Sequence, residues 1–341
     1  MPDWLDWKIG SLIVGWVFVF LWVPIVIRSN RKTHPKELFI LFFAELWERF
    51  SFYGMRAILT LYMTKLLFVE LGEGGAKAQA LGIYGAFNAL LYGAPVIGGM
   101  LADRLLGFRR SIIFGGSVMA AGQFVLAATI GSEQLFFWGL ALIVVGNGLF
   151  KPNISSFLGT FYDREDPRKD NAYTIFYMGI NVGAFLSPLT CGYLGEEKGW
   201  EYGFLAAGIG IVLGVVVFWW HLSKTPQHGA PPSQELLHEP YFLGMSRSTV
   251  TVLGALLATV PISFLLNNES VLVGMLAVVG VGILGYLLFT ASRDEDRVAG
   301  ERLSVFVVLF MFHMVFWALF EQAGGSLTLL TEKNIDRGDI P

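Results

Sequence analysis

Long apolar runs, separated by short polar connections, follow one another along most of the chain. Several runs exceed the roughly 18 residues that mark a membrane-spanning helix. The runs are continuous rather than alternating, which argues against a transmembrane β-barrel. They predict ten spans, at about residues 9–28, 38–67, 78–102, 111–130, 134–160, 171–194, 202–222, 249–266, 271–290 and from 303 onward. The pattern therefore predicts an all-α polytopic membrane protein.

Composition agrees with this class. Charged residues make up 15% of the 341 residues and hydrophobic residues 54%, whereas a soluble domain carries about 25% charged residues. The single cysteine, Cys191, cannot form an internal disulfide, and the five histidines are not spaced as metal ligands are. We expect no metal, no cofactor and no nucleic-acid partner; the lipid bilayer is the expected environment.

The distribution of basic residues predicts the orientation. Arg28, Arg31, Lys32 and Lys36 follow the first span, and the positive-inside rule puts that connection in the cytoplasm and the N-terminus outside. The connections at 103–110 and 163–170 are basic and are predicted to be cytoplasmic as well. The segment 224–248 is polar and rich in proline, which predicts a cytoplasmic linker.

Four charges lie inside the second apolar run. Glu45, Glu48, Arg49 and Arg56 fall on one face of a helix with a period of 3.6 residues. A charge near the bilayer centre costs roughly 2.5–3.5 kcal/mol, so four facing lipid would cost about 10 kcal/mol. They are therefore expected to face other helices or water. The alternative is a cytoplasmic helix end whose charged side chains reach back to the membrane surface.

A further charge, Lys151, lies in the fifth run, beside Pro152. At 1.5 Å per residue, Lys151 is about 13 Å from the cytoplasmic end of its helix and Glu45 about 12 Å from the same side. Opposite charges at equal depth predict an ion pair between these two residues. The alternative is a lysine whose ammonium group reaches the membrane surface.

The connection at residues 98–110 contains Gly99, Asp103, Arg104, Gly107 and Arg109. This spacing is similar to the loop between the second and third helices of major facilitator transporters. The aspartate is expected to cap the next helix or to pair with a basic residue, in a contact made in one conformation and broken in another. The alternative is an ordinary basic cytoplasmic loop.

Two more polar residues lie in apolar runs. Asn181 is an amide among small neighbours, suited either to bind a ligand or to bond another helix. Glu321 lies about 27 Å from Leu303 if that helix is straight, which puts it in the outer half of the membrane. There it could meet a cationic group of a ligand, serve an outer gate, or be an ordinary interfacial glutamate.

Four motifs together resemble the proton-dependent oligopeptide transporters. They are E-x-x-E-R-F-x-x-Y-G from Glu45, G-x-F-K-P-N around Lys151, F-Y-x-x-I-N-x-G around Asn181 and F-x-x-F-E-Q ending at Gln322. The resemblance covers about Thr33 to the end. It implies a major facilitator fold in a bacterial inner membrane, with proton-coupled symport of di- and tripeptides by alternating access.

The resemblance also implies roles for individual residues. The implied proton-coupling residues are Glu45, Glu48, Arg49 and Lys151. The implied substrate-binding residues are Arg56, Tyr53 and Lys151 for the peptide carboxylate, Asn181 for its backbone, Trp317 for a side chain and Glu321 for its amino end and for outer gating. Phe52 stands where the family usually has a further tyrosine.

The predicted organisation has four parts. They are an extra N-terminal span (1–33), a six-helix bundle (34–223), a linker with an inserted two-helix hairpin (224–300), and the first helix of an incomplete second bundle (301–341). Because alternating access needs two bundles, we expect the chain to transport only with the remainder supplied. The alternatives are a peptide-binding or sensing protein that does not transport and a carrier of another small solute. No nucleophile–base pair indicates an enzyme.

Overall fold

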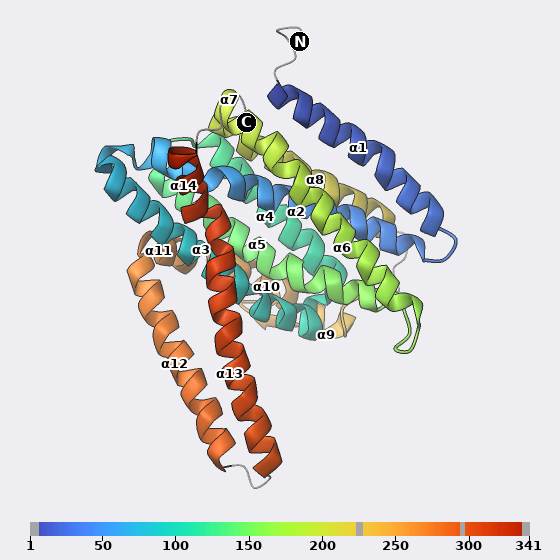
Figure 1. Ribbon diagram of the computed structural model, residues 1–341. Coiled ribbons are helices and arrows are strands. Elements are labelled where there is room, and N and C mark those ends of the chain that lie inside the picture. The colour runs from blue at the N-terminus through green and yellow to red at the C-terminus, as the bar shows by residue number, and fades with distance from the viewer. Residues whose placement is uncertain (1–6, 223–227, 294–296, 336–341) are drawn as a thin grey trace.

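The computed structural model describes residues 7–222, 228–293 and 297–335, and these are almost entirely helical (Figure 1). The first part contains α1 Trp7–Asn30, α2 Lys36–Tyr62, α3 Gly72–Leu101, α4 Gly107–Ala128, α5 Glu133–Gly159, α6 Arg168–Ser187, α7 Tyr193–Glu197 and α8 Trp200–Leu222. The second contains α9 Gln234–His238, β1 Pro240–Phe242, β2 Met245–Ser246, α10 Arg247–Leu257, α11 Thr259–Asn267, α12 Glu269–Arg293, α13 Arg297–Phe320 and α14 Ser326–Asn334. Short 3₁₀ or π turns connect several of them, namely η1 Met63–Leu67, η2 Val69–Leu71, η3 Ala102–Leu106, η4 Pro188–Gly192 and η5 Glu321–Gly324.

Eight helical runs of the described residues are long and apolar enough to cross a membrane. One of them, Val69–Ala128, contains both α3 and α4. The 27-residue α2 is a further helix of spanning length, and its apolar character is interrupted by the four charges. The predicted all-α polytopic fold is confirmed, and the chain is a multi-pass membrane protein.

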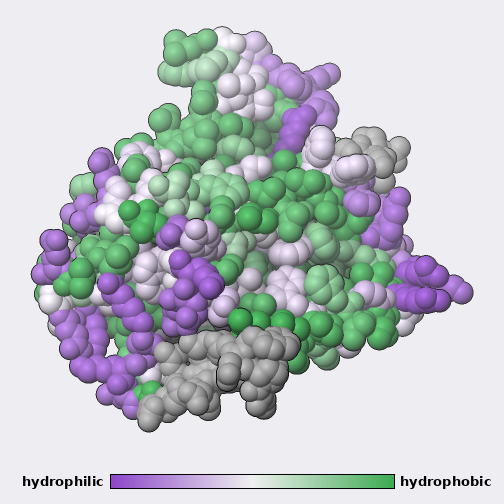
Figure 2. Space-filling model, turned by 90° about the horizontal axis from the view of Figure 1, so that it is seen from above, coloured by the Kyte–Doolittle hydropathy of each residue, from purple (hydrophilic) through white to green (hydrophobic). Residues whose placement is uncertain are grey.

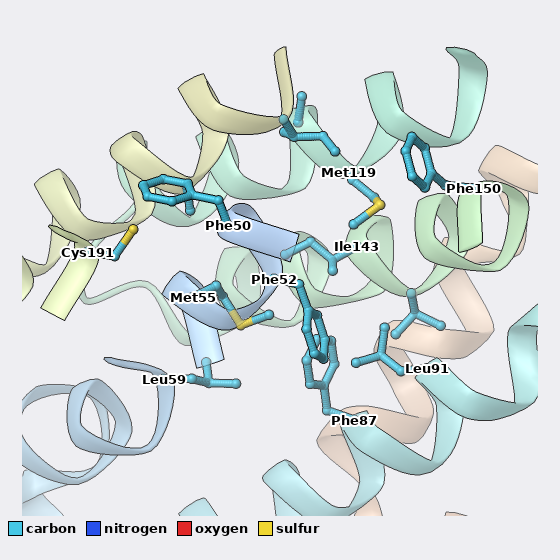
Figure 3. Packing of buried hydrophobic residues seen from close by; sticks show 14 of the residues in the cluster. Phe50, Phe52, Met55, Leu59, Phe87, Leu91, Met119, Ile143, Phe150 and Cys191 are labelled. Carbon is cyan, nitrogen blue, oxygen red and sulfur yellow. The ribbon is translucent and has the colours of Figure 1, made fainter. Parts of the chain in front are cut away.

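Helix α2 forms the centre of the bundle. It packs against α6 and α8, while α4 packs against α5 and α8, and α3 against α5. Side chains from α2, α3, α4 and α5 meet in a continuous apolar core, in which Phe52 and Met55 lie near Phe87 and Leu91 (Figure 3). This core fixes the rotation of α2, and with it the direction in which the charged face points.

Glycine allows the closest helix contact. A Cβ on Gly98 of α3 would overlap the carbonyl of Gly148 in α5. The two backbones therefore touch just beside the helical turn that carries Lys151, and small residues at such a crossing let helices approach closely.

Helix α1 lies against the outside of the bundle, along α6 and η4 (Figure 1). The Trp16 indole donates a hydrogen bond to the hydroxyl of Thr190 at 3.0 Å, and its ring lies 6.1 Å from that of Trp47. Val19 is also buried, whereas the opposite side of α1, including Val14, Phe20 and Leu21, is exposed, as expected of a helix that contacts lipid. This is the extra N-terminal span that the sequence predicts.

Helices α12 and α13 pair with each other and extend away from the bundle (Figure 1). Only 6% of the spanning window of each is buried. Apolar residues cover wide areas of the molecular surface (Figure 2). The predicted inserted hairpin (runs 249–266 and 271–290) corresponds to α10–α11 and α12, but α12 packs mainly against α13. The division into a hairpin and a second bundle stays a prediction, and α13 offers most of its surface to lipid or to further helices.

Two details differ from the prediction. The sequence predicts a cytoplasmic linker over 224–248 and assigns no helix or strand to it; residues 224–227 lie outside the described residues, and the described remainder contains α9 and the β1–β2 hairpin. The last helix was expected to continue past Glu321, but α13 ends at Phe320 and η5 begins at Glu321. The glycines at 324 and 325 lack a Cβ, which favours a break in the helix.

Candidate functional site

The buried charges of α2 form one cluster. Glu45, Glu48 and Arg49, called the charge cluster below, are 4%, 0% and 4% exposed. The Nε of Arg49 lies 3.1 Å from Glu45 Oε1 and 2.5 Å from Glu48 Oε2. The guanidinium also lies 5.3 Å from the centre of the Phe52 ring. One arginine therefore holds two carboxylates in a site from which water is largely excluded.

The charge cluster retains unused bonding capacity. Glu45 Oε2, Glu48 Oε1 and Arg49 Nη2 are buried and have no hydrogen-bond partner among the described residues. A buried charged group with an unsatisfied atom costs more than 1–3 kcal/mol, roughly. Each carboxylate has a free oxygen that can take a proton, and two carboxylates compete for one arginine. This arrangement suits a change of protonation state.

The predicted ion pair between Lys151 and Glu45 is wrong for this conformation. Among the described residues, Lys151 makes no ion pair; its ammonium group lies 4.7 Å from the centre of the Tyr92 ring. Arg49 is one and four residues from the two glutamates on the same helix, and it satisfies them locally. Lys151 is left to contact an aromatic face in a cation–π interaction.

A second group of polar residues joins η5 to α2 and α3. The Arg56 guanidinium lies 2.8 Å from the Glu321 carboxylate, and the Tyr92 hydroxyl donates to the same carboxylate at 2.9 Å. Tyr84 donates to the Glu321 carbonyl at 3.4 Å, and its ring lies 5.7 Å from the Arg56 guanidinium. Arg56, Tyr84, Tyr92 and Glu321 are called the closing network below.

Neighbouring contacts strengthen the closing network. Thr60 donates a hydrogen bond to the Gly324 carbonyl at 2.6 Å, and Lys65 pairs with Glu332 at 2.5 Å. Lys333 pairs with Glu73. Side chains of α2, α3 and η1 are therefore bonded to η5 and α14 at one end of the bundle.

Three other predicted site residues lie outside both the charge cluster and the closing network. Asn181 is exposed and donates to the carbonyl of Tyr177 in its own helix at 3.1 Å, and in this conformation it bonds no second helix among the residues that the structure describes. The exposed Trp317 donates to His313 at 2.7 Å. Tyr53 is half-buried, with its ring 5.1 Å from that of Phe52.

The loop between α3 and α4 is tightly packed. Gly99 lies near Pro152, and Gly107, at φ 74°, lies against the backbone of Ala230 and Pro231. Asp103 and Arg104 are exposed in η3.

The contact predicted for Asp103, made in one conformation and broken in another, stays a prediction, since in the part of the chain that the structure describes Asp103 neither caps α4 nor forms an ion pair. The π-helical turn directs its side chain to the surface instead. The backbone N–H of Arg109 donates to the Gly229 carbonyl at 3.2 Å.

Comparison with known proteins identifies the family of this chain. The family model described as "POT family" matches residues 109–339. The chain belongs to the POT family.

Among curated relatives, an uncharacterized transporter YclF of Bacillus subtilis (strain 168) is 37% identical over 89% of this chain and 61% of its own length. The dipeptide and tripeptide permease A of Proteus mirabilis (strain HI4320) is 34% identical over 90% of this chain and 60% of its own. This chain thus spans about three fifths of the length of these relatives.

Solved POT structures have the same fold. A peptide transporter in complex with sulfate has a TM-score of 0.72 and 34% identity, over 89% of this chain and 62% of the other. A POT family transporter in complex with 5-aminolevulinic acid has a TM-score of 0.71 and 30% identity, over 88% and 62%.

Sequence reasoning missed two members of the closing network. Tyr84 and Tyr92 lie in α3 eight residues apart, with the buried Asn88 between them. This spacing of four puts all three on one face of a helix. A polar stripe in an otherwise apolar span was the signal that could have identified them in a POT family chain.

Proposed function

We propose that this chain is the larger part of a transporter that carries di- and tripeptides across a bacterial inner membrane together with protons. The observation that supports the proposal most is the charge cluster, two buried carboxylates held by one arginine at 3.1 and 2.5 Å. The curated relatives that are named as peptide permeases and transporters support the substrate class.

Proton coupling follows from competition for Arg49. When Glu45 or Glu48 takes a proton, one carboxylate no longer attracts the guanidinium, and Arg49 is free to move toward another anion. Lys151 lies close by on α5, where its ammonium group contacts the Tyr92 ring and makes no ion pair with any residue that the structure describes. Protonation thus makes a positively charged side chain available to a peptide carboxylate, and this links the transport of the proton to the transport of the peptide.

Peptide binding is linked in the same way to the closing network. A peptide zwitterion offers a carboxylate that suits Arg56 and an ammonium group that suits Glu321, but here these two side chains bind each other. A bound peptide would replace that pair, with Tyr53 and Lys151 at the carboxylate, Asn181 at the backbone and Trp317 near a side chain. Breaking the network would open this end of the bundle, which we assign to the outside.

Proteoliposomes test the proposal. The complete transporter that contains this chain should accumulate a labelled dipeptide under an inward proton gradient, and unlabelled tripeptide should compete; the variants below are made in that complete protein. Binding of the peptide without accumulation would favour a peptide-binding or sensing protein. Accumulation of another small solute that peptides do not inhibit would contradict the substrate class.

Replacing Lys151 with alanine is expected to abolish gradient-driven uptake, because the mobile cation that shares the peptide carboxylate is lost. Uptake should fall at least about tenfold, the effect of about 1.4 kcal/mol. Lys198→Ala is the matched control, since Lys198 is exposed at the end of α7 and should transport normally. Unchanged uptake by Lys151→Ala would contradict the role of Lys151.

Replacing Glu45 with glutamine is expected to remove coupling while expression is retained. The amide keeps the size of the side chain but cannot exchange a proton. Exchange of labelled for unlabelled peptide without a gradient should continue, whereas accumulation driven by the gradient should be lost. Glu133→Gln, at an exposed position at the start of α5, should leave both intact. Gradient-driven accumulation by Glu45→Gln would argue against Glu45 as a proton site.

A further inference from the structure

The described segment from His228 to Ser246, before α10, is fixed to the bundle at no fewer than two points. Leu237 of α9 is fully buried among Leu106 and Leu149. The rings of His228 and Phe161 are stacked with centres 5.0 Å apart. The segment is therefore a folded strap along the predicted cytoplasmic end of α3 and α5.

A tight hairpin follows α9. Strand β1 pairs with β2 in antiparallel fashion, with Phe242 opposite Met245. Tyr241, Phe242 and Leu243 at its tip are 63%, 57% and 83% exposed. Three consecutive large and mainly apolar side chains thus project at the tip of the hairpin.

The backbone of the tip holds this arrangement. Leu243 has φ 50°, a left-handed conformation that side chains other than that of glycine rarely adopt. Gly244 follows at φ 77°. The turn directs the leucine side chain outward, where no described residue covers it.

The hairpin is joined directly to a membrane span. Helix α10 begins at Arg247, and the run Arg247–Asn267 is long and apolar enough to cross the bilayer. The Arg247 N–H donates to the Glu239 carbonyl at 3.0 Å, and its Nε lies 3.0 Å from the Glu239 carboxylate. The hairpin is thus tied to the first residue of the span, so its tip lies at the level where that span enters the membrane.

The chemistry of the tip fits a membrane interface. The Arg247 guanidinium lies 5.0 Å from the centre of the Tyr241 ring, and aromatic rings with neighbouring arginine are enriched at the headgroup level. Leu253, Leu256 and Leu257 of α10 are also exposed, as expected of a span that contacts lipid. A protein partner would need an interface of about 1,000 Å² or more, whereas a bilayer needs no matched surface.

We propose that Tyr241, Phe242 and Leu243 form an anchor that inserts into the boundary between lipid headgroups and acyl chains, in the leaflet that α10 enters. The strap is then held at two places, by Leu237 in the protein and by the hairpin tip in lipid. The anchor does not depend on peptide transport, and it would be present in a protein that only binds peptides.

Site-directed spin labelling in lipid nanodiscs tests the anchor. A Leu243→Cys label, in a Cys191→Ala background, should be more accessible to oxygen, which concentrates in lipid, than to a water-soluble nickel chelate. The matched control is Gln234→Cys, an exposed polar position of the same strap, where the label should favour the nickel chelate several-fold. Since Cys191 is itself fully buried, the native cysteine can be kept if its removal impairs folding.

Two results would overturn the proposal. A label at position 243 that is as accessible to the nickel chelate as the label at position 234 would put the tip in water. A label shielded from both reagents would mean that protein covers the tip. Labelling at Tyr241 gives a second measurement, and the depth there should be shallower than at position 243, because the Tyr241 ring contacts Arg247.

Discussion

Replacing Arg49 with methionine is expected to destabilise the bundle by about 3–5 kcal/mol, the usual result of leaving a buried charge without its partner. Methionine keeps much of the volume of arginine, so packing changes little. Glu45 and Glu48, at 4% and 0% exposure, would then repel each other with no cation in contact. Thermal unfolding of the purified protein in detergent or nanodiscs should show a large drop in the midpoint temperature.

Two further variants separate charge from packing. Arg49→Lys keeps a cation and should recover part of the lost stability. The triple variant Glu45→Gln, Glu48→Gln, Arg49→Met contains no charge and should be close to the native protein in stability, because neutral replacements of a buried ionic group are often neutral or stabilising. A native midpoint temperature for Arg49→Met alone would mean that the carboxylates are not ionised in the folded protein.

The spans and the charged face of α2 could be predicted from sequence because both depend on local spacing. Glu45 and Arg49 are four residues apart, the distance at which side chains on a helix meet, and the structure pairs them at 3.1 Å. Several apolar runs gave the helix limits closely, for example 134–160 for α5 and 202–222 for α8. These inferences need no knowledge of which helices are neighbours.

The contacts of Lys151 and Glu321 could not be predicted because they depend on neighbours that are distant in sequence. Equal depth in the membrane suggested that Lys151 meets Glu45, but depth does not fix the direction of a side chain, and Lys151 lies against Tyr92. Glu321 bonds Arg56, 265 residues away. That contact requires α13 to end at Phe320, so that η5 turns toward α2.

The β1–β2 hairpin gave no sequence signal for a different reason. Its strands are three and two residues long, too short for an alternating pattern to be recognised. A proline-rich polar stretch usually indicates an irregular linker. The burial of Leu237 between η3 and α5 is what orders this stretch, and it depends on tertiary packing alone.

The charge cluster and the closing network both depend on α2. Arg49 and Arg56 are seven residues apart, about 10 Å along one helix. A rotation or tilt of α2 that follows a change at Glu48 would therefore move Arg56 relative to Glu321. The helix that holds the proposed proton site thus also holds half of the contact that closes the bundle, and its packing against α6 limits how it can move.

Replacing Gly183 with alanine is expected to disturb this packing, because the added Cβ would overlap the Leu46 carbonyl and lie 2.9 Å from Phe50 N and 3.0 Å from Arg49 Cβ. These are backbone and Cβ atoms that cannot turn aside, so α6 must shift away from α2 at a cost of about 1–3 kcal/mol. Thermal unfolding should show the loss, and uptake should fall because Arg49 moves with its helix. Gly85→Ala is the control, since no atom lies within 4 Å of its added Cβ; in the interior of α3 it should be neutral or stabilise by up to about 1 kcal/mol. Equal stability of the two variants would contradict close contact of α2 and α6 at Gly183.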